Sequence, residues 1–192
     1  MSSLHRGPSL KRSLLARLRG TAGDERGLSA VEFALIVPIM ISLYLGAVEF
    51  GHALTIDRRV TSVASATADL VAQVETMDSS AVTDVFEAAT AILTPYATSP
   101  LSIVVTSVVA DEDNKTTVAW SCARNGTAHP DDSSYTLPAG LTQPFSSVIV
   151  AEVSYVYDPP VGQYLTGGIT MGETFYLRPR RSLEVDLTSN CP

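Results

Sequence analysis

The sequence predicts an α+β fold, in which a long amino-terminal transmembrane helix continues into a domain with an antiparallel sheet of about four strands. Two observations carry this prediction. No charged residue lies between Glu32 and Glu49, and residues 28–54 as a helix would be about 40 Å long, more than the ~30 Å core of a bilayer. After residue 100 the chain changes to runs rich in Val, Ile and Thr between turn residues, a pattern typical of strands.

The helical pattern persists beyond the apolar segment. Apolar residues recur at steps of three and four up to Val74, so we expect the first helix to continue out of the membrane. A break at residues 77–80 supplies capping residues for a second helix over 81–93, which Thr94-Pro95 ends.

The β pattern predicts four strands in an antiparallel meander, over residues 101–110, 115–122, 147–157 and 173–181. The first two form a hairpin through the acidic turn 111–114, a long loop covers 123–144, and the tail 182–192 packs along the sheet through Cys191. We therefore expect four regions: a cytoplasmic basic leader (1–27), a transmembrane helix (28–54), an exported helical segment (55–99) and a periplasmic β domain (100–192).

The distribution of charge predicts the orientation in the membrane. Six basic and two acidic residues precede Leu28, a balance of +4, so the overall formal charge of −7 leaves −11 for residues 28–192. Basic residues beside an apolar helix favour a cytoplasmic amino terminus. A single span then places the rest of the chain on the other face of the inner membrane, which in a Gram-negative cell is the periplasm. Nucleic acid is not expected as a partner, since topology explains the basic arm.

A cleaved secretory signal is the main alternative for the first fifty residues. Against it, the apolar region exceeds the usual ~7–15 residues, and Gly51-His52-Ala53 is a poor small-residue cleavage site. A retained helix is therefore the prediction. Within it, Pro38 would cause a gentle kink, and Gly46 and Gly51 leave little bulk for helix packing, although their spacing is not GxxxG. Glu49, beside Gly51, is expected at the membrane interface.

Both cysteines, Cys122 and Cys191, lie on the predicted exported side. An oxidising compartment favours a disulfide between them, the alternative being two buried free thiols. The three histidines are scattered, and no CxxC, HExxH, GxSxG or P-loop occurs, so no metal, cofactor, small-molecule substrate or enzymatic activity is predicted.

The opening of the apolar segment has a distinctive order. A basic segment ends at Arg26-Gly27, four small or apolar residues follow from Leu28, and then come Glu32 and Phe33. A carboxylate so near the start of a membrane segment is costly without a partner, which makes Glu32 a candidate functional residue. This order resembles the processing site of type IV pilin-like precursors. The longer string through Pro38, Gly46, Glu49, Phe50 and Gly51 resembles the TadE-like pseudopilins of the Flp/Tad (tight-adherence) system.

The resemblance implies that a membrane prepilin peptidase, supplied in trans, cuts between Gly27 and Leu28. Glu32, with Phe33 beside it, would then set the register of assembly by meeting the Leu28 amine of a neighbouring subunit. It also implies a minor pseudopilin or assembly component of the pilus, whose partners are other Tad components and pseudopilins, the peptidase and the lipid bilayer. Two alternatives remain: a TadG-like assembly protein, and a single-pass membrane protein with a periplasmic ligand-binding domain.

Overall fold

A computed structural model describes residues 25–160, 162 and 168–192. The basic leader expected over residues 1–27 lies almost wholly outside this range. The chain divides into two compact units, Met1–Ala47 and Val48–Pro192, which are described separately. One helix, α2 (Glu25–Ala72), contributes residues to both units.

The described part of the first unit is the amino-terminal portion of α2. Large apolar side chains cover this portion on all sides and are exposed, as expected for a helix surrounded by lipid rather than by protein. Within the described chain, α2 alone is long and apolar enough to cross a membrane. Pro38 lies inside the helix and has no N–H for the carbonyl of Ala34, while the Ser42 hydroxyl donates to the Pro38 carbonyl oxygen at 2.8 Å.

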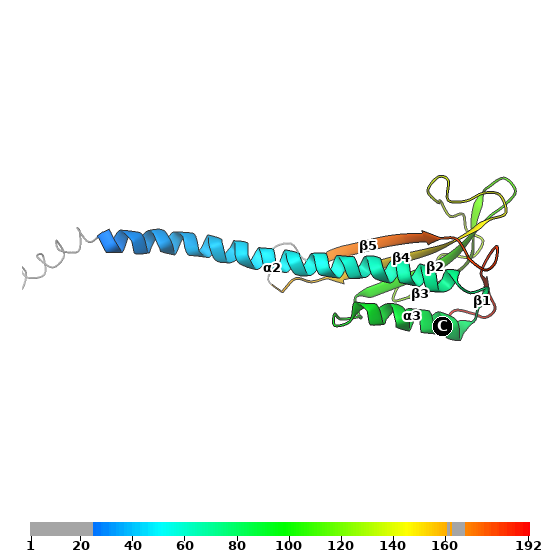
Figure 1. The fold of residues 1–192 in the computed structure, drawn as a ribbon, viewed down its shortest axis with the longest axis horizontal. Helices are drawn as coiled ribbons and strands as arrows, with labels where there is room; N and C mark the ends of the chain where they lie inside the picture. The colour runs from blue at the N-terminus through cyan, green and yellow to red at the C-terminus, as the bar shows by residue number, and fades with distance from the viewer. Residues whose placement is uncertain (1–24, 161, 163–167) are drawn as a thin grey trace, which may run out of the picture. The chain divides into compact units, whose positions relative to one another are not determined.

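The second unit combines the remainder of α2 with a second helix and two small sheets (Figure 1). Helix α3 (Ser79–Leu93) starts two residues before the predicted position because Asp78 caps it, accepting a hydrogen bond from the Ala81 amide at 2.8 Å. The strands of the larger sheet are β2 (Leu101–Ala110), β3 (Thr116–Arg124), β4 (Ser147–Tyr157) and β5 (Ile169–Leu177).

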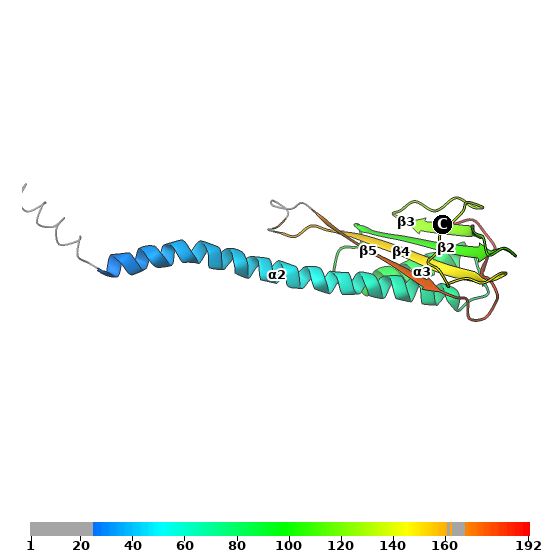
Figure 2. The same ribbon diagram turned by 90° about the horizontal axis from the view of Figure 1, so that it is seen from above.

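The larger sheet is antiparallel, as predicted, but it is not a meander. Its strand order is β3-β2-β4-β5, so β4 pairs with β2 and not with β3 (Figure 2). Two features explain the difference. β2 is buried along nearly its whole length, as a central strand must be, and the loop after β3 lies along the free edge of β3, where Thr117 bridges Ser134.

The fourth strand also differs from its prediction over residues 173–181. β5 begins at Ile169, opposite Tyr157 of β4, and ends at Leu177, opposite Ile149. The glycine-rich sequence indicated a loop there, yet Gly172 pairs within the strand, and Pro179 lacks the N–H that would continue the ladder. β3 likewise extends two residues beyond the predicted end at Cys122.

A second, two-stranded sheet was not predicted. Strand β1 (Thr76–Met77), just after α2, pairs in parallel with β6 (Asp186–Leu187) in the tail. The Trp120 indole N–H donates to the Val185 carbonyl oxygen at 2.6 Å, which ties the tail to β3. Pairs of such short strands carry no pattern that sequence periodicity can reveal.

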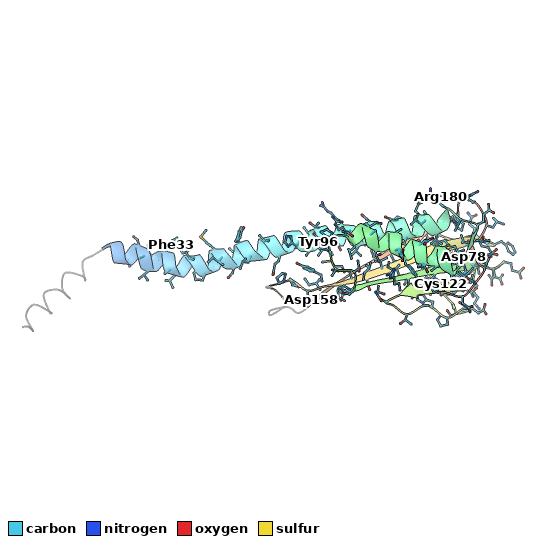
Figure 3. All side chains as sticks on the ribbon, turned by 90° about the horizontal axis from the view of Figure 1, so that it is seen from below. Phe33, Asp78, Tyr96, Cys122, Asp158 and Arg180 are labelled. Carbon is cyan, nitrogen blue, oxygen red and sulfur yellow. A yellow bond between two sulfur atoms is a disulfide. The ribbon has the colours of Figure 1, made fainter. Side chains whose placement is uncertain are left out.

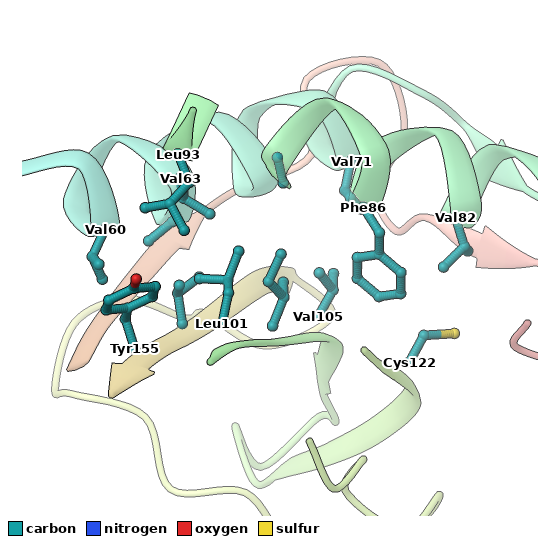
Figure 4. Packing of buried hydrophobic residues seen from close by; sticks show 14 of the residues in the cluster. Val60, Val63, Val71, Val82, Phe86, Leu93, Leu101, Val105, Cys122 and Tyr155 are labelled. Atoms are coloured by element: carbon teal, nitrogen blue, oxygen red, sulfur yellow. The ribbon is translucent and has the colours of Figure 1, made fainter. Parts of the chain in front are cut away.

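The core lies between the two helices and one face of the larger sheet (Figure 4). From α2 it takes a stripe that includes Ile56, Val60, Val63 and Val71, and Phe86 and Leu93 of α3 pack beside this stripe. On the opposite face of the sheet the long loop covers a smaller cluster built on Val108, Val148 and Val150. The two helices and this loop therefore shield most of both sheet faces.

Candidate functional site

The predicted processing segment forms the start of α2. Gly27 and Leu28 are helical, since α2 begins at Glu25, and a side chain added at Gly27 would meet nothing within 4 Å. Leu28 and Phe33 are 63% and 68% exposed, and Figure 3 shows the Phe33 side chain projecting from the helix. Among the described residues, the side chains of this segment are therefore exposed.

Glu32 follows Leu28 by four residues, so the two side chains share one face of α2. Glu32 is exposed, and within the described residues no hydrogen bond or ion pair reaches its carboxylate. An ionised carboxylate in or near hydrocarbon is costly without a partner. Any partner for Glu32 within the membrane must therefore come from lipid, from another molecule or from the residues that the structure does not describe.

Gly46 and Gly51 lie on α2 with open space around them. A Cβ added at either position would meet no atom within 4 Å. Five residues separate them, which is about 140° around a helix, so they do not form one continuous small-residue face. A side chain at either position would therefore meet no neighbour among the described residues.

Glu49, predicted at the membrane interface, makes a contact with a loop of the second unit. Its carboxylate accepts a hydrogen bond from the Gly162 amide, with 3.1 and 3.0 Å to the two oxygens, and so joins α2 to the connection between β4 and β5. A Cβ at Gly162 would lie 2.9 Å from a Glu49 carboxylate oxygen. Burial raises the pKa of nearby Tyr157, and the Glu49 charge adds to this effect, so the Tyr157 hydroxyl stays neutral beside the carboxylate.

Cys122 and Cys191 form a disulfide, as the sequence predicted (Figure 3 labels Cys122). Their Cα atoms are 5.4 Å apart, within the usual range for a disulfide. Cys122 is fully buried in β3, so the bond fixes the tail against the sheet.

Sequence reasoning missed a polar cluster where the long loop crosses the outer face of the sheet. His129 Nε2 lies 2.6 Å from a Glu152 carboxylate oxygen, and the ring of Tyr135 meets the His129 ring edge-on at 5.1 Å between centroids. Burial raises the Tyr135 pKa, and the neighbouring Glu152 raises it further. The cluster borders an open hollow of about 370 Å³. Isolated His and Tyr residues gave no spacing from which to predict it.

Sequence reasoning also missed the role of Arg59, whose guanidinium reaches the end of α3. It donates to the carbonyl oxygens of Ile92 and Thr94 at 2.7 and 2.6 Å, and it lies 5.4 Å from the centroid of the Tyr96 ring. Figure 3 shows Tyr96 beside α2. In the described residues no group of three His, Cys, Asp or Glu side chains is placed to hold a metal ion.

These features define a class of protein: a membrane-anchored chain whose apolar helix leads into a disulfide-linked α+β unit. The family comparison is more specific. Residues 27–69 match the family model TadE, described as TadE-like protein, which confirms the resemblance seen in the sequence. The match begins at Gly27 and covers almost all of α2, but none of the sheet. Comparison with curated proteins and with solved structures gave no match.

The match therefore associates this segment with a component of the Tad pilus. It favours a role among pilus structural and assembly components over a catalytic role, and it indicates interaction with other pilus components.

Proposed function

We propose that this protein is a minor pseudopilin or assembly component of the Flp/Tad pilus, cut after Gly27 by a prepilin peptidase. The observation that carries the proposal is the family match, which starts at Gly27 and extends over the apolar helix that contains Glu32. The exposed start of α2 gives a peptidase access to the bond between Gly27 and Leu28.

The proposed topology is a single pass through the inner membrane. Residues 1–27 are the cytoplasmic leader and 28–54 cross the bilayer, while 55–99 and 100–192 form the exported unit. The excess of basic residues before Leu28 supports this orientation. The Cys122–Cys191 disulfide supports it too, because disulfides persist in oxidising compartments.

Glu32 is proposed to guide assembly. Cleavage would give Leu28 a free amine, and the Glu32 carboxylate of a neighbouring subunit can neutralise that positive charge. In a low-dielectric environment the attraction is on the order of several kcal/mol, opposed by the desolvation of both groups. The pair therefore acts mainly on the register between subunits, and Phe33 beside it would help to define that register.

Two substitutions test this proposal in a strain that lacks the native copy. Gly27→Val places a β-branched side chain before the scissile bond, so the longer precursor should accumulate and pili should be lost. Gly46→Val makes the same change farther along α2, at a position equally free of neighbours, and should be trimmed normally. Immunoblots for mature-sized protein and counts of surface pili provide the measurements.

Glu32→Gln keeps the size of the side chain and removes its charge. Membrane insertion should be unimpaired, since a buried charge is lost, whereas incorporation into the pilus assembly should fall. Normal trimming of Gly27→Val would exclude processing at this bond. Normal piliation with Glu32→Gln would show that the charge has no role in assembly.

A further inference from the structure

Strand β5 forms one edge of the larger sheet. It pairs with β4 on one side, and within the described residues no strand pairs with its other side. Its nine residues include no Lys, Arg or Pro, and Glu173 is its one charged residue. Natural proteins usually protect an edge of this length with charges, proline, a bulge or a covering segment. Among the described residues, the backbone groups on that side of β5 are therefore open to another strand.

The opposite edge of the same sheet is covered. The Val118 amide of β3 donates to the Ser133 carbonyl, and the Val118 carbonyl accepts from the Asp132 amide, both at 2.9 Å. The disulfide-linked tail follows, with Cys191 beside the Ser121 carbonyl oxygen. The chain thus covers its β3 edge and leaves the β5 edge open.

The ends of β5 are fixed relative to the part of α2 that belongs to the second unit. Before β5, the Gly162 amide donates to Glu49. After β5, the Arg180 amide donates to the Ala72 carbonyl at 2.9 Å, and the Arg180 side chain pairs with Asp69 at 2.5 Å. Strand β5 therefore runs alongside α2 in the same direction, and under the proposed topology its beginning, near Glu49, faces the membrane.

This direction excludes an antiparallel pair of β5 strands from two copies, and charge disfavours a parallel pair, because residues 28–192 of each copy carry a net charge of −11. Antiparallel pairing of two β5 strands in one continuous sheet would turn the second copy end over end, so that the two Glu49 ends could not face one membrane. Pairing of β5 with β3 of another copy would keep both copies upright. However, the segment around Ser133 and the linked tail already occupy that edge of β3.

We propose that the β5 edge accepts an extended segment of a different exported protein, which adds a fifth strand to the sheet. Main-chain hydrogen bonds would supply the affinity and side-chain pairs the specificity. Gly172 is exposed and leaves room for a large, preferably aromatic, side chain on the added strand. A Lys or Arg of the partner would lie opposite Glu173, in keeping with the net negative charge of residues 28–192. The exclusion of the antiparallel pair rests on the proposed membrane topology.

The test places a photo-crosslinking amino acid at Thr170 or Thr174 of the full-length chain, in cells that assemble pili. Both positions lie on one face of β5, so an added strand should be attached at two points four residues apart in one segment. A partner helix would instead be attached about nine residues apart, since a helix rises 1.5 Å per residue and a strand about 3.3 Å. Thr136, exposed in the long loop near β3, is the control position for crosslinking.

With the crosslinker at Thr170, Thr174→Lys should lower adduct yield at least tenfold because a lysine on the edge disfavours strand addition. The matched change Thr136→Lys should leave the yield unchanged. Formation of the Cys122–Cys191 bond and the membrane level of each variant show that folding is intact.

Three outcomes would each overturn the proposal: attachment points nine residues apart, adducts between two differently tagged copies, and no adduct. Trimming after Gly27 is measured in the same samples. Absence of an adduct with normal trimming would overturn strand addition alone, whereas absence of trimming would overturn the proposed processing.

Discussion

Arg59 supplies a positive charge that the last turn of α3 lacks in its own sequence. The last turn of α3 contains no basic residue, so its carbonyl groups lack a local positive charge. The Arg59 guanidinium, on α2, donates to two carbonyls at that end and lies over the Tyr96 ring. One side chain thus fixes the end of α3 against α2.

Arg59→Met should lower the free energy of unfolding of the exported unit by about 1–3 kcal/mol, as expected for hydrogen bonds made by a charged group. Arg58→Met removes a neighbouring charge from an exposed position and should change it little. Chemical denaturation of the full chain in detergent measures both. Equal effects of the two substitutions would show that overall charge, rather than the contact with α3, is responsible.

Asp78 gives the start of α3 a pH-dependent contribution. Hydrogen bonds from the Ser80 hydroxyl and from the Ala81 amide lower the pKa of its carboxyl below the ordinary 3.8. A lowered pKa in the folded state means that the stabilisation is present above pH 3.8 and is lost as the pH falls through the folded value.

Asp78→Asn should therefore reduce the loss of stability on acidification below pH 3.8 and leave neutral stability nearly unchanged, because Asn is also a good cap. Asp78→Ala should weaken the unit at neutral pH. Thermal unfolding of the two variants and the parent protein across this pH range provides the comparison. Identical acid profiles for the parent protein and the Asp78→Asn variant would contradict the assignment.

The residues of the candidate site were predictable to different degrees. The roles of Gly27, Glu32 and Phe33 stay predictions from their local order in the sequence, whereas the cap near residues 77–80 was predicted and is made by Asp78. Arg59 was different, because its partners are more than thirty positions away and nothing in its neighbourhood indicates them. Glu49 was placed only at an interface, since its contact with Gly162 depends on the fold of the sheet.

At the scale of elements, α2 presents two different environments along one helix. Its first part is apolar on all sides, whereas its later part buries one stripe in the core and exposes polar residues elsewhere. These patterns made the helix predictable from sequence. The edges of the sheet were harder to predict. Strand order depends on which segments cover β3, and the glycine within β5 gives that part of the sequence the composition of a loop.

Two isoleucines of α2 test this division. Ile56 is 1% exposed and Ile39 is 63% exposed. Ile56→Ala should lower the free energy of unfolding of the exported unit by about 2–5 kcal/mol, the usual cost of such a core truncation. Ile39→Ala should leave that value unchanged. Urea denaturation of the full chain in detergent, followed by Trp120 fluorescence, measures both, and similar losses would show that the division is wrong.

At the scale of the whole molecule, the Cys122–Cys191 disulfide holds the tail of the exported unit across a sequence separation of 69. Replacing both cysteines by serine should lower the free energy of unfolding by about 2–5 kcal/mol, as in small secreted domains. Thiol labelling of the unfolded, unreduced wild-type protein should find no reactive group, and labelling of both cysteines would contradict the bond. The Trp120 contact with Val185 should keep part of the tail in place after reduction.

The parallel pairing of β1 with β6 has a consequence for biogenesis. Under the proposed topology the residues after the membrane helix emerge in chain order, so β1 emerges more than a hundred residues before β6, with which it pairs. The pair therefore cannot form until β6 has crossed the membrane, since long-range pairs form only after the intervening chain is available. A chain that stalls before Val185 has crossed would lack both this pair and the Trp120–Val185 contact, so the two contacts together report that translocation has passed β6.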